Sequence, residues 1–244
     1  MGNGNFTLSD RLAKLPPMNL NSDIALRVVV DSGAVAWTDS PEPGVQRRAL
    51  ARDGGEVARA TSVVRYAPGA RFARHRHDLG EEFLVLDGEF CDEHGVYGRG
   101  TYVKNPPGSS HSPWSTTGCT IFVKLRHLDP ADRQRIVVSG NQLQWLPGSV
   151  PGLSVVPLSS FGSQHTALVR WRAGTRFHAH RHDGGEEIFV VSGVFEDEHG
   201  RYPAGTWIRS PHMSLHEPYS REGCTILVKT GHLRDANVEL REVS

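Results

Sequence analysis

Cysteine is scarce in this chain of 244 residues, which has only Cys91, Cys119 and Cys224 and no Cys-x-x-Cys spacing. An odd, unpatterned set fits a reducing compartment better than a secreted disulfide scaffold, so we expect a cytoplasmic protein. Long apolar runs are also missing: no stretch approaches the ~20 residues of a membrane span, and the first residues lack the apolar segment of a signal peptide. We therefore expect a soluble protein without a membrane partner.

Net charge is absent as well, because 27 Lys and Arg residues balance 27 Asp and Glu residues. A chain without excess positive charge has no global field that attracts nucleic acid, so we expect no nucleic-acid partner. At this length a folded chain buries a substantial core. Neither disulfides nor metal ions are therefore required for folding.

An internal repeat dominates the sequence. When the chain is shifted by 105 residues, segment 64–128 aligns without a gap with segment 169–233, and 35 of the 65 positions are identical. Farther upstream the offset becomes 108, as Trp37 and Trp145 show. The chain therefore contains two copies of one unit.

Each copy consists of short β-branched and apolar runs, such as TSVVRY and EFLVL, separated by clusters of Gly, Pro, Asp and Ser. This pattern predicts an all-β sandwich or small barrel. Helix signals are confined to residues 8–15 and 129–135. The predicted organisation is an N-terminal arm (1–36), a first β-domain (37–128), a linker (129–136) and a second β-domain (137–244).

The spacing of four residues within the repeat predicts a metal site. Residues i and i+2 of a strand point to the same face, so His75 and His77 project side by side. Glu81 follows the next turn, and His111 comes from a later strand. Three imidazoles and one carboxylate suit iron, manganese, nickel, copper, cobalt or zinc. The second copy repeats the set as His180, His182, Glu186 and His216.

These residues resemble the sequence motifs of the cupin family. The first cupin motif, Gly-x5-His-x-His-x3–4-Glu-x6-Gly, is matched by Gly69, His75, His77, Glu81 and Gly88, and again by Gly174, His180, His182, Glu186 and Gly193. A one-residue bulge would exchange Glu81 with Glu82, or Glu186 with Glu187, but only Glu81 and Glu186 satisfy both intervals of the motif.

The second cupin motif is matched less completely. Gly100, Pro106, Gly108 and His111 fit it, but Ser115 stands where the family has Asn. In the second copy Met213 replaces the glycine and Ser220 replaces the Asn.

The sequence around the motifs most resembles the ChrR-type cupin subgroup, and this resemblance extends from about Trp37 to Leu233. This resemblance implies a bicupin, with two tandem jelly-roll (double-stranded β-helix) barrels that each enclose a metal pocket. It implies two divalent transition metals per chain, with iron as the leading catalyst and zinc, nickel or manganese as alternatives. A homodimer is compatible with it.

The resemblance also implies an Fe(II) dioxygenase that cleaves a carbon–carbon bond in a small ketone or dicarbonyl; it names no catalytic residue beyond the metal ligands. One alternative is an isomerase or lyase that uses the metal as a Lewis acid. Another is a ligand-sensing or redox-sensing module related to ChrR-type anti-sigma factors. The segment before Trp37 has no Cys or His that could form the N-terminal zinc cluster of those factors, which disfavours this alternative.

Further residues are candidates for groups that contact the metal ligands from behind: Glu82, Glu187, His178 and His212. His178 shares a strand face with His180, and His212 lies in the loop before the last ligand, so we expect the second pocket to be the more polar. Lys124 and Lys229 are repeated positions in a chain with few lysines. They are either outward-facing ion-pair residues or partners of an anionic substrate near the metal.

Overall fold

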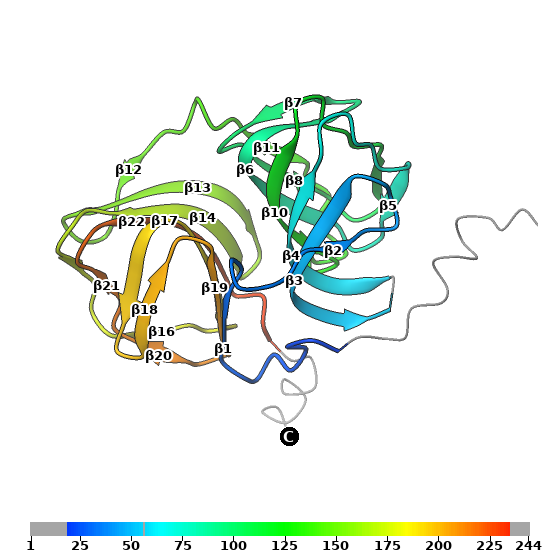
Figure 1. Ribbon diagram of the computed structural model, residues 1–244. Helices are drawn as coiled ribbons and strands as arrows, with labels where there is room; N and C mark the ends of the chain where they lie inside the picture. Colours follow the sequence, from blue (N-terminus) through cyan, green and yellow to red (C-terminus); the bar gives the residue numbers. More distant parts are fainter. Residues whose placement is uncertain (1–18, 56, 235–244) are drawn as a thin grey trace, which may run out of the picture.

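The computed structural model describes residues 19–55 and 57–234, and every regular element within these ranges is a β-strand. Two barrels lie side by side, one built mainly from each half of the chain (Figure 1). The predicted all-β fold with two jelly-roll barrels is confirmed. Residues 8–15 lie outside the described ranges, and residues 129–135 form turns rather than a helix, because Asp129 and Asp132 each accept a backbone N–H two residues on.

The first barrel contains an antiparallel sheet of eight strands. In pairing order they are β11 (Ile136–Val138), β8 (Tyr102–Asn105), β6 (Glu81–Asp92), β10 (Cys119–Leu125), β4 (Ala58–Tyr66), β3 (Val45–Gly54) and β2 (Thr38–Asp39), with β7 (Gly95–Gly98) beside β6.

The second barrel repeats this order in a sheet of ten strands. They are β1 (Val28–Asp31), β19 (Thr206–Ser210), β17 (Glu186–Asp197), β22 (Cys224–Thr230), β14 (Gln164–Trp171), β13 (Leu153–Phe161) and β12 (Leu146–Pro147), with β18 (Gly200–Pro203), β15 (Thr175–Arg176) and β21 (Tyr219–Ser220) beside this path.

Two short ladders carry the histidines predicted to bind metal. In the first barrel β5 (His75–His77) pairs with β9 (Ser109–His111). In the second, β16 (His180–Arg181) pairs with β20 (Leu215–His216). Each ladder brings together ligands that lie more than thirty positions apart in sequence.

The two halves exchange their first strands, which corrects the predicted domain boundaries. Strand β1 pairs with β19 of the second barrel, and β11 pairs with β8 of the first. The predicted N-terminal arm therefore contains a strand of the second barrel, and the predicted second domain begins with residues of the first. The segment that precedes each barrel adds the edge strand to the sheet of the other barrel.

Separate apolar cores fill each barrel and the space between them. Phe83, Val85 and Ile121 belong to the interior of the first barrel, and Ile188, Val190 and Ile226 are their counterparts in the second. A third cluster joins both barrels, and within it Phe122 stacks on Phe189 with ring centroids 4.4 Å apart. The third cluster makes the barrels pack on each other through an apolar interface.

A buried polar cluster, here called the seam, lies at the same interface. Its members are Glu82, Lys124, His127, Glu187, Lys229 and His232. Lys229 Nζ lies 2.7 Å from Glu82 Oε2, and Lys124 Nζ lies 2.5 Å from Glu187 Oε2, so each ion pair takes one residue from each barrel. The seam therefore links the barrels electrostatically as well as through apolar packing.

Hydrogen bonds complete the seam and fix its protonation. His127 and Tyr102 bond to Glu82, while His232 bonds to Glu187 at 3.2 Å. Burial lowers the pKa of His127 to about 3 and that of His232 to about 4, so both imidazoles are neutral donors at neutral pH. Burial opposes ionisation of Glu82, but Lys229 and His127 hold its pKa well below the usual range.

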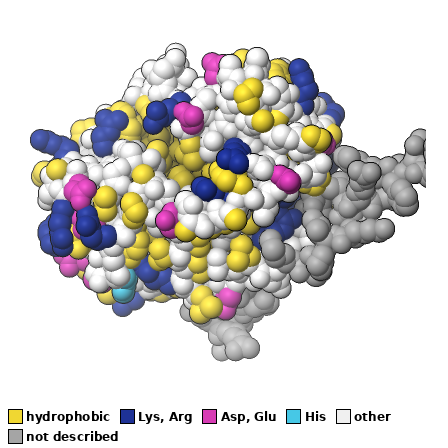
Figure 2. All heavy atoms as spheres, in the orientation of Figure 1, with side chains coloured by type: hydrophobic (Ala, Val, Ile, Leu, Met, Phe, Trp, Pro, Cys, Tyr) yellow, Lys and Arg dark blue, Asp and Glu magenta, His cyan; other side chains and the backbone are white. Residues whose placement is uncertain are grey.

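The molecular surface mixes charges of both signs. On the face shown in Figure 2, Lys and Arg side chains are interspersed with Asp and Glu. Within the described ranges no helix has the length and apolar character needed to cross a bilayer.

Candidate metal centres

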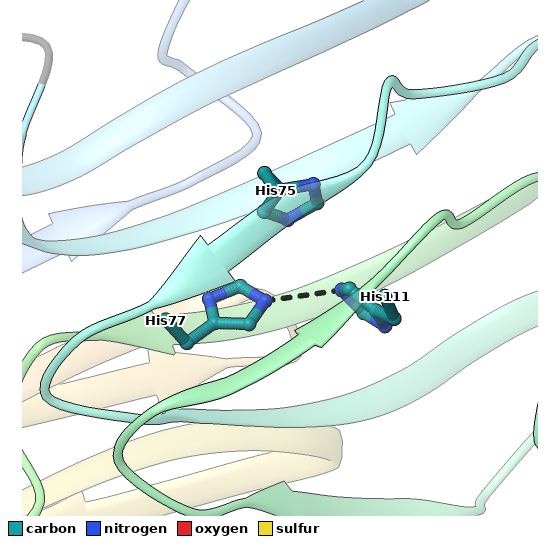
Figure 3. Close-up of side chains that lie close together, drawn as sticks. All are labelled: His75, His77 and His111. Carbon is teal, nitrogen blue, oxygen red and sulfur yellow. Dashed lines mark hydrogen bonds between the residues drawn. The ribbon is translucent and has the colours of Figure 1, made fainter.

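The first candidate metal centre forms where β5 and β9 pair. His75 lies opposite His111 in the ladder, and His77 lies two residues farther along β5. The three rings converge, with one nitrogen of each within 4.8 Å of the others and the Nε2 atoms of His77 and His111 3.0 Å apart (Figure 3). These three imidazoles could hold one metal ion.

Hydrogen bonds to the Nδ1 atoms orient two of these rings. His75 Nδ1 lies 2.9 Å from the carbonyl oxygen of Ala73, and His111 Nδ1 lies 3.2 Å from Asp92 Oδ2. Both oxygens are acceptors, so Nδ1 carries the proton and the Nε2 lone pair remains available to a metal. Burial lowers the pKa of His75 and His77, which keeps these rings neutral, as ligands must be.

Glu81 completes the donor set of the first centre. Its Oε2 atom lies 3.5 Å from His77 Nε2 and 3.7 Å from His111 Nε2, and the residue is buried. Asn105 Nδ2 donates a hydrogen bond of 3.0 Å to the same oxygen. Burial opposes ionisation of Glu81, but the histidines and Asn105 hold its pKa below the usual value, so the carboxylate is charged.

A chain of side chains supports His111 and Glu81 from behind. Tyr97 donates a hydrogen bond of 2.8 Å to Asp92, which accepts from His111. Arg135, immediately before the exchanged strand β11, donates to Tyr97 at 2.6 Å and to Asn105 Oδ1 at 3.3 Å. The exchanged segment thus reaches the first metal centre through both of its supporting partners.

The second candidate centre has the same three-histidine geometry. His180, His182 and His216 each place a nitrogen within 4.8 Å of the others, and the Nε2 atoms of His182 and His216 are 2.9 Å apart. Glu186 Oε2 lies 3.5 Å from His182 Nε2 and 3.6 Å from His216 Nε2. This second set could also hold a metal ion.

The carboxylate environments of the two centres differ. Ser210 stands where the first copy has Asn105, and Glu186 Oε2 is buried without a hydrogen-bond partner among the described residues. Burial therefore raises the pKa of Glu186 to about 7. An orphaned buried acceptor beside three imidazoles fits a bound cation, which would satisfy it.

The support behind His216 is looser than that behind His111. Asp197 Oδ2 lies 4.0 Å from His216 Nδ1, beyond hydrogen-bond distance. Tyr202 donates to Asp197 at 2.7 Å, and Arg27, just before the exchanged strand β1, lies 3.1 Å from Asp197 and 2.7 Å from the Tyr202 hydroxyl. Here the exchanged arginine contacts the aspartate directly, and within the described ranges it makes no hydrogen bond to a partner of Glu186.

Some of these supporting residues recur in the internal repeat. Asp92 and Tyr97 recur as Asp197 and Tyr202 at the same offset as the histidines. Arg27 and Arg135 stand before similar runs, RVVV and RIVV, at the upstream offset of 108. What sequence could not show is that these runs exchange between barrels.

The two remaining predicted neighbours of the second centre, His178 and His212, are exposed. The His178 ring stacks on Phe177, its centroid lies 6.0 Å from that of the His180 ring, and the His178 carbonyl oxygen lies 2.9 Å from His180 Nδ1. His212 accepts the Gly184 N–H at 2.9 Å in the turn before Glu186. His178 therefore contacts a candidate ligand through its backbone, whereas His212 contacts the turn.

The glutamates and lysines of the seam also depart from expectation. Strand alternation turns Glu82 and Glu187 away from the face that carries Glu81 and Glu186, and their hydrogen-bond partners among the described residues belong to the interface. We predicted that these two glutamates contact the metal ligands, but the structure places them in the seam between the barrels. Lys124 and Lys229 are neither outward-facing nor beside a metal centre, because they pair with these glutamates.

A cavity of about 350 Å³ opens beside the first centre. His75, His77 and Glu81 lie in its wall, together with apolar side chains and Tyr66. This volume lies within the usual range for small-molecule sites, ~300–1,000 Å³. Two barrels with a buried three-histidine centre in each define the class of protein: a bicupin with two potential metal sites.

The sequence matches the ChrR cupin-like domain family twice, over residues 25–129 and 133–234, and the chain belongs to this family. The matched ranges include strand β1 in the first copy and β11 in the second. A comparison with curated proteins found no match to the sequence.

Several solved structures share the fold. A candidate dioxygenase from Nostoc punctiforme superposes with a TM-score of 0.71 at 14% identity, over 87% of this chain and 85% of that chain. Protein Ylba from E. coli gives 0.69 at 14% identity, over 93% and 98%. Oxalate decarboxylase from Lactobacillus farciminis, in a formate complex, gives 0.59 at 15% identity, over 88% and 90%. At these identities the likeness shows the fold alone.

Proposed function

We propose that the protein is a metal-dependent enzyme, a non-haem Fe(II) dioxygenase that cleaves a carbon–carbon bond in a small ketone or dicarbonyl. The observation that carries the proposal is the first centre, where three imidazoles and a carboxylate converge, and His75, His77 and Glu81 of this set lie in the wall of a cavity large enough for a small molecule. A structural metal site is normally closed by its ligands, whereas a catalytic one adjoins space for substrate. The fold shared with a candidate dioxygenase supports the same class.

The ligands proposed for the first site are His75, His77, Glu81 and His111, and for the second His180, His182, Glu186 and His216. A bound Fe(II) ion would supply the redox and Lewis-acid chemistry by which dioxygen and an enolate combine. The residues of the chain orient the substrate and exclude water. The wall of the cavity is largely apolar, with Val64, Ile121 and Val123 among its residues, which favours a desolvated substrate.

Tyr66 is the cavity residue best placed to hold a proton near the substrate. It is buried, and its hydroxyl makes no hydrogen bond to any described residue. Burial raises its pKa, Glu81 raises it further, and Arg47 lowers it. The phenol therefore stays protonated and is available as a donor to a substrate oxygen.

The test begins with metal content. Protein purified without added metal should contain about two transition-metal ions per chain, and the double variant His75→Ala/His77→Ala should contain about one. The iron-loaded protein should then consume dioxygen with a β-dicarbonyl compound, and the double variant should lose this activity. Wild-type protein loaded with zinc serves as a control, because zinc has no redox chemistry.

The alternatives give different results. Turnover that persists without air would replace the dioxygenase by an isomerase or lyase. Ligand binding without turnover under any metal would indicate a sensing module. Unchanged metal content in the double variant would contradict the first site altogether.

A further inference from the structure

Arg47 lines the first cavity, and the equivalent position of the second barrel has no arginine. Arg47 lies on β3 two residues after Val45, so it shares the inward face of that strand, and it pairs across the sheet with Val64. Arg47 and Val64 line the same cavity as the metal-centre residues His75 and His77. At the equivalent position of the second barrel, Val155 pairs with Val169.

The guanidinium of Arg47 is held in place without being neutralised. It is half-buried, and its Nη2 donates a hydrogen bond of 2.7 Å to the Ser40 hydroxyl. Within the described ranges no carboxylate lies at ion-pair distance from it, although Glu42 lines the same cavity and accepts the Ala73 N–H at 3.4 Å. Its remaining N–H groups therefore have no partner of opposite charge.

Three other arginines around the cavity are paired with carboxylates. Arg74 pairs with Glu93 at 2.9 Å, and Arg76 and Arg126 lie 3.5 Å and 3.1 Å from Asp78. Among these four arginines, Arg47 is the one without a carboxylate partner in the part of the chain that the structure describes. A half-buried guanidinium in a largely apolar wall favours a carboxylate strongly, because charge-assisted hydrogen bonds gain from poor solvation.

Tyr66 adds a second donor on the same side. It lies opposite Val45 in the sheet, adjacent to the Arg47 pairing position, and the charges of Glu81 and Arg47 both reach its phenol. The second barrel has Trp171 here, which offers one N–H and no hydroxyl. The first barrel thus has two donors and a positive charge at the positions where the second has an indole and a valine.

We propose that the first barrel takes a small anionic substrate, with one end at the metal centre and a carboxylate at Arg47 and Tyr66, and that the second barrel lacks this preference. The inference deepens the proposed function and rests on a metal-binding first pocket. It names the substrate class as a dicarbonyl that also carries a carboxylate.

The experiment measures binding rather than turnover. Two cobalt-loaded single-site proteins are compared without air: His180→Ala/His182→Ala, which keeps the first site, and His75→Ala/His77→Ala, which keeps the second. The probes are 4,6-dioxoheptanoate and its methyl ester, which share a chelating dicarbonyl and differ in charge. Dissociation constants come from calorimetry, and the cobalt visible spectrum reports whether each probe reaches the metal.

In the first-site protein the acid should bind at least tenfold more tightly than the ester. Arg47→Val, which copies the second barrel, should abolish this preference while the ester binds as before, and Arg47→Lys should restore part of it. Arg65→Val is the matched control, because it removes the same charge from the exposed face of the neighbouring strand. It should leave the preference intact, and the second-site protein should show none.

Equal binding of acid and ester at the first site would overturn the inference, as would a preference that survives Arg47→Val. So would failure of the acid to bind the first-site protein, or an equal preference at the second site. The proposed dioxygenase activity fails separately: absence of oxygen uptake by the iron-loaded protein overturns that activity and leaves the measured binding preference standing.

Discussion

At the seam between the barrels, Glu82 meets Lys229 and Glu187 meets Lys124, so the two copies present the same residues to each other. Inside the barrels the copies differ, since Asn105 faces one metal-site carboxylate and Ser210 stands at the same position in the other half. Each seam ion pair needs both halves at once, and a change in one copy leaves a buried charge in the other unpaired. Each pocket, in contrast, is built almost entirely within one barrel. A duplicated chain can therefore change one pocket freely but must keep its seam symmetrical.

The largest expected effect comes from breaking this symmetry at the seam. Lys229→Met leaves the buried Glu82 carboxylate without its cation and should lower the free energy of unfolding by about 3–5 kcal/mol. Lys124→Met should lower the free energy of unfolding by a similar amount, because it leaves the buried Glu187 carboxylate without its cation. Denaturant unfolding measures both.

The matched control is Arg176→Met, which removes a positive charge from an exposed pair with Glu217 at 3.8 Å. Surface pairs contribute about 0–1 kcal/mol, so this variant should unfold almost as the parent does. A seam variant no less stable than the control would show that the cross-barrel pairs do not hold the barrels together.

The next largest effect concerns the carboxylate partners. Asn105→Ser removes the hydrogen bond to Glu81 and should weaken metal binding at the first site roughly 10–100-fold. Ser210→Asn should strengthen the second site if the new amide reaches Glu186. Competition with a chelator in each single-site background measures both affinities, and the comparison fails if Asn105→Ser leaves the first-site affinity unchanged.

The two sites should also respond differently to pH. Metal and proton compete for the carboxylate, and the pKa of about 7 at Glu186 means that lowering the pH from 8 to 6 protonates it, which costs the second site about tenfold in affinity. The depressed pKa of Glu81 keeps the first-site carboxylate ionised throughout this range. The pKa of His111 and that of His216 are both raised, so their protonation weakens both sites. The ratio of the first-site affinity to the second-site affinity should therefore rise by about tenfold as the pH falls from 8 to 6. A ratio that stays constant in chelator titrations at the two pH values would refute this difference.

Sequence was sufficient where a local rule fixes the geometry. Strand alternation places His75 and His77 on one face, and the same rule separates Glu81 from Glu82, which points into the seam. The gapless repeat was sufficient to predict two barrels with the same fold. These features depend on residues that are close together in the chain, and such residues can be read from the sequence.

The remaining features depend on partners that local pattern does not encode. A three-residue strand such as β11 has the same alternation whichever sheet it joins, so its exchange between barrels was invisible. Lys124 stands in an apolar strand, and nothing in that strand tells whether its outer face meets water or another barrel. Arg47 and Val155 correspond at the upstream offset of 108, outside the gapless repeat, and the sequence of neither strand shows that these two side chains face a pocket.

The smallest expected effect tests the loop before the last ligand. Met213 has φ of 60°, where its counterpart Gly108 has φ of 86°, and both donate a backbone N–H to the carbonyl of a ligand histidine, His182 or His77. The turn thus demands a left-handed residue in both copies, and only the first copy supplies glycine. Met213 is 46% exposed, so its side chain contributes little packing. Met213→Gly should therefore raise the free energy of unfolding by up to about 1 kcal/mol, and Gly108→Ala should lower it by a similar amount. A Met213→Gly protein that is less stable than the parent would mean that the methionine makes contacts worth more than the backbone strain, and the two loops would then differ in packing as well as in sequence.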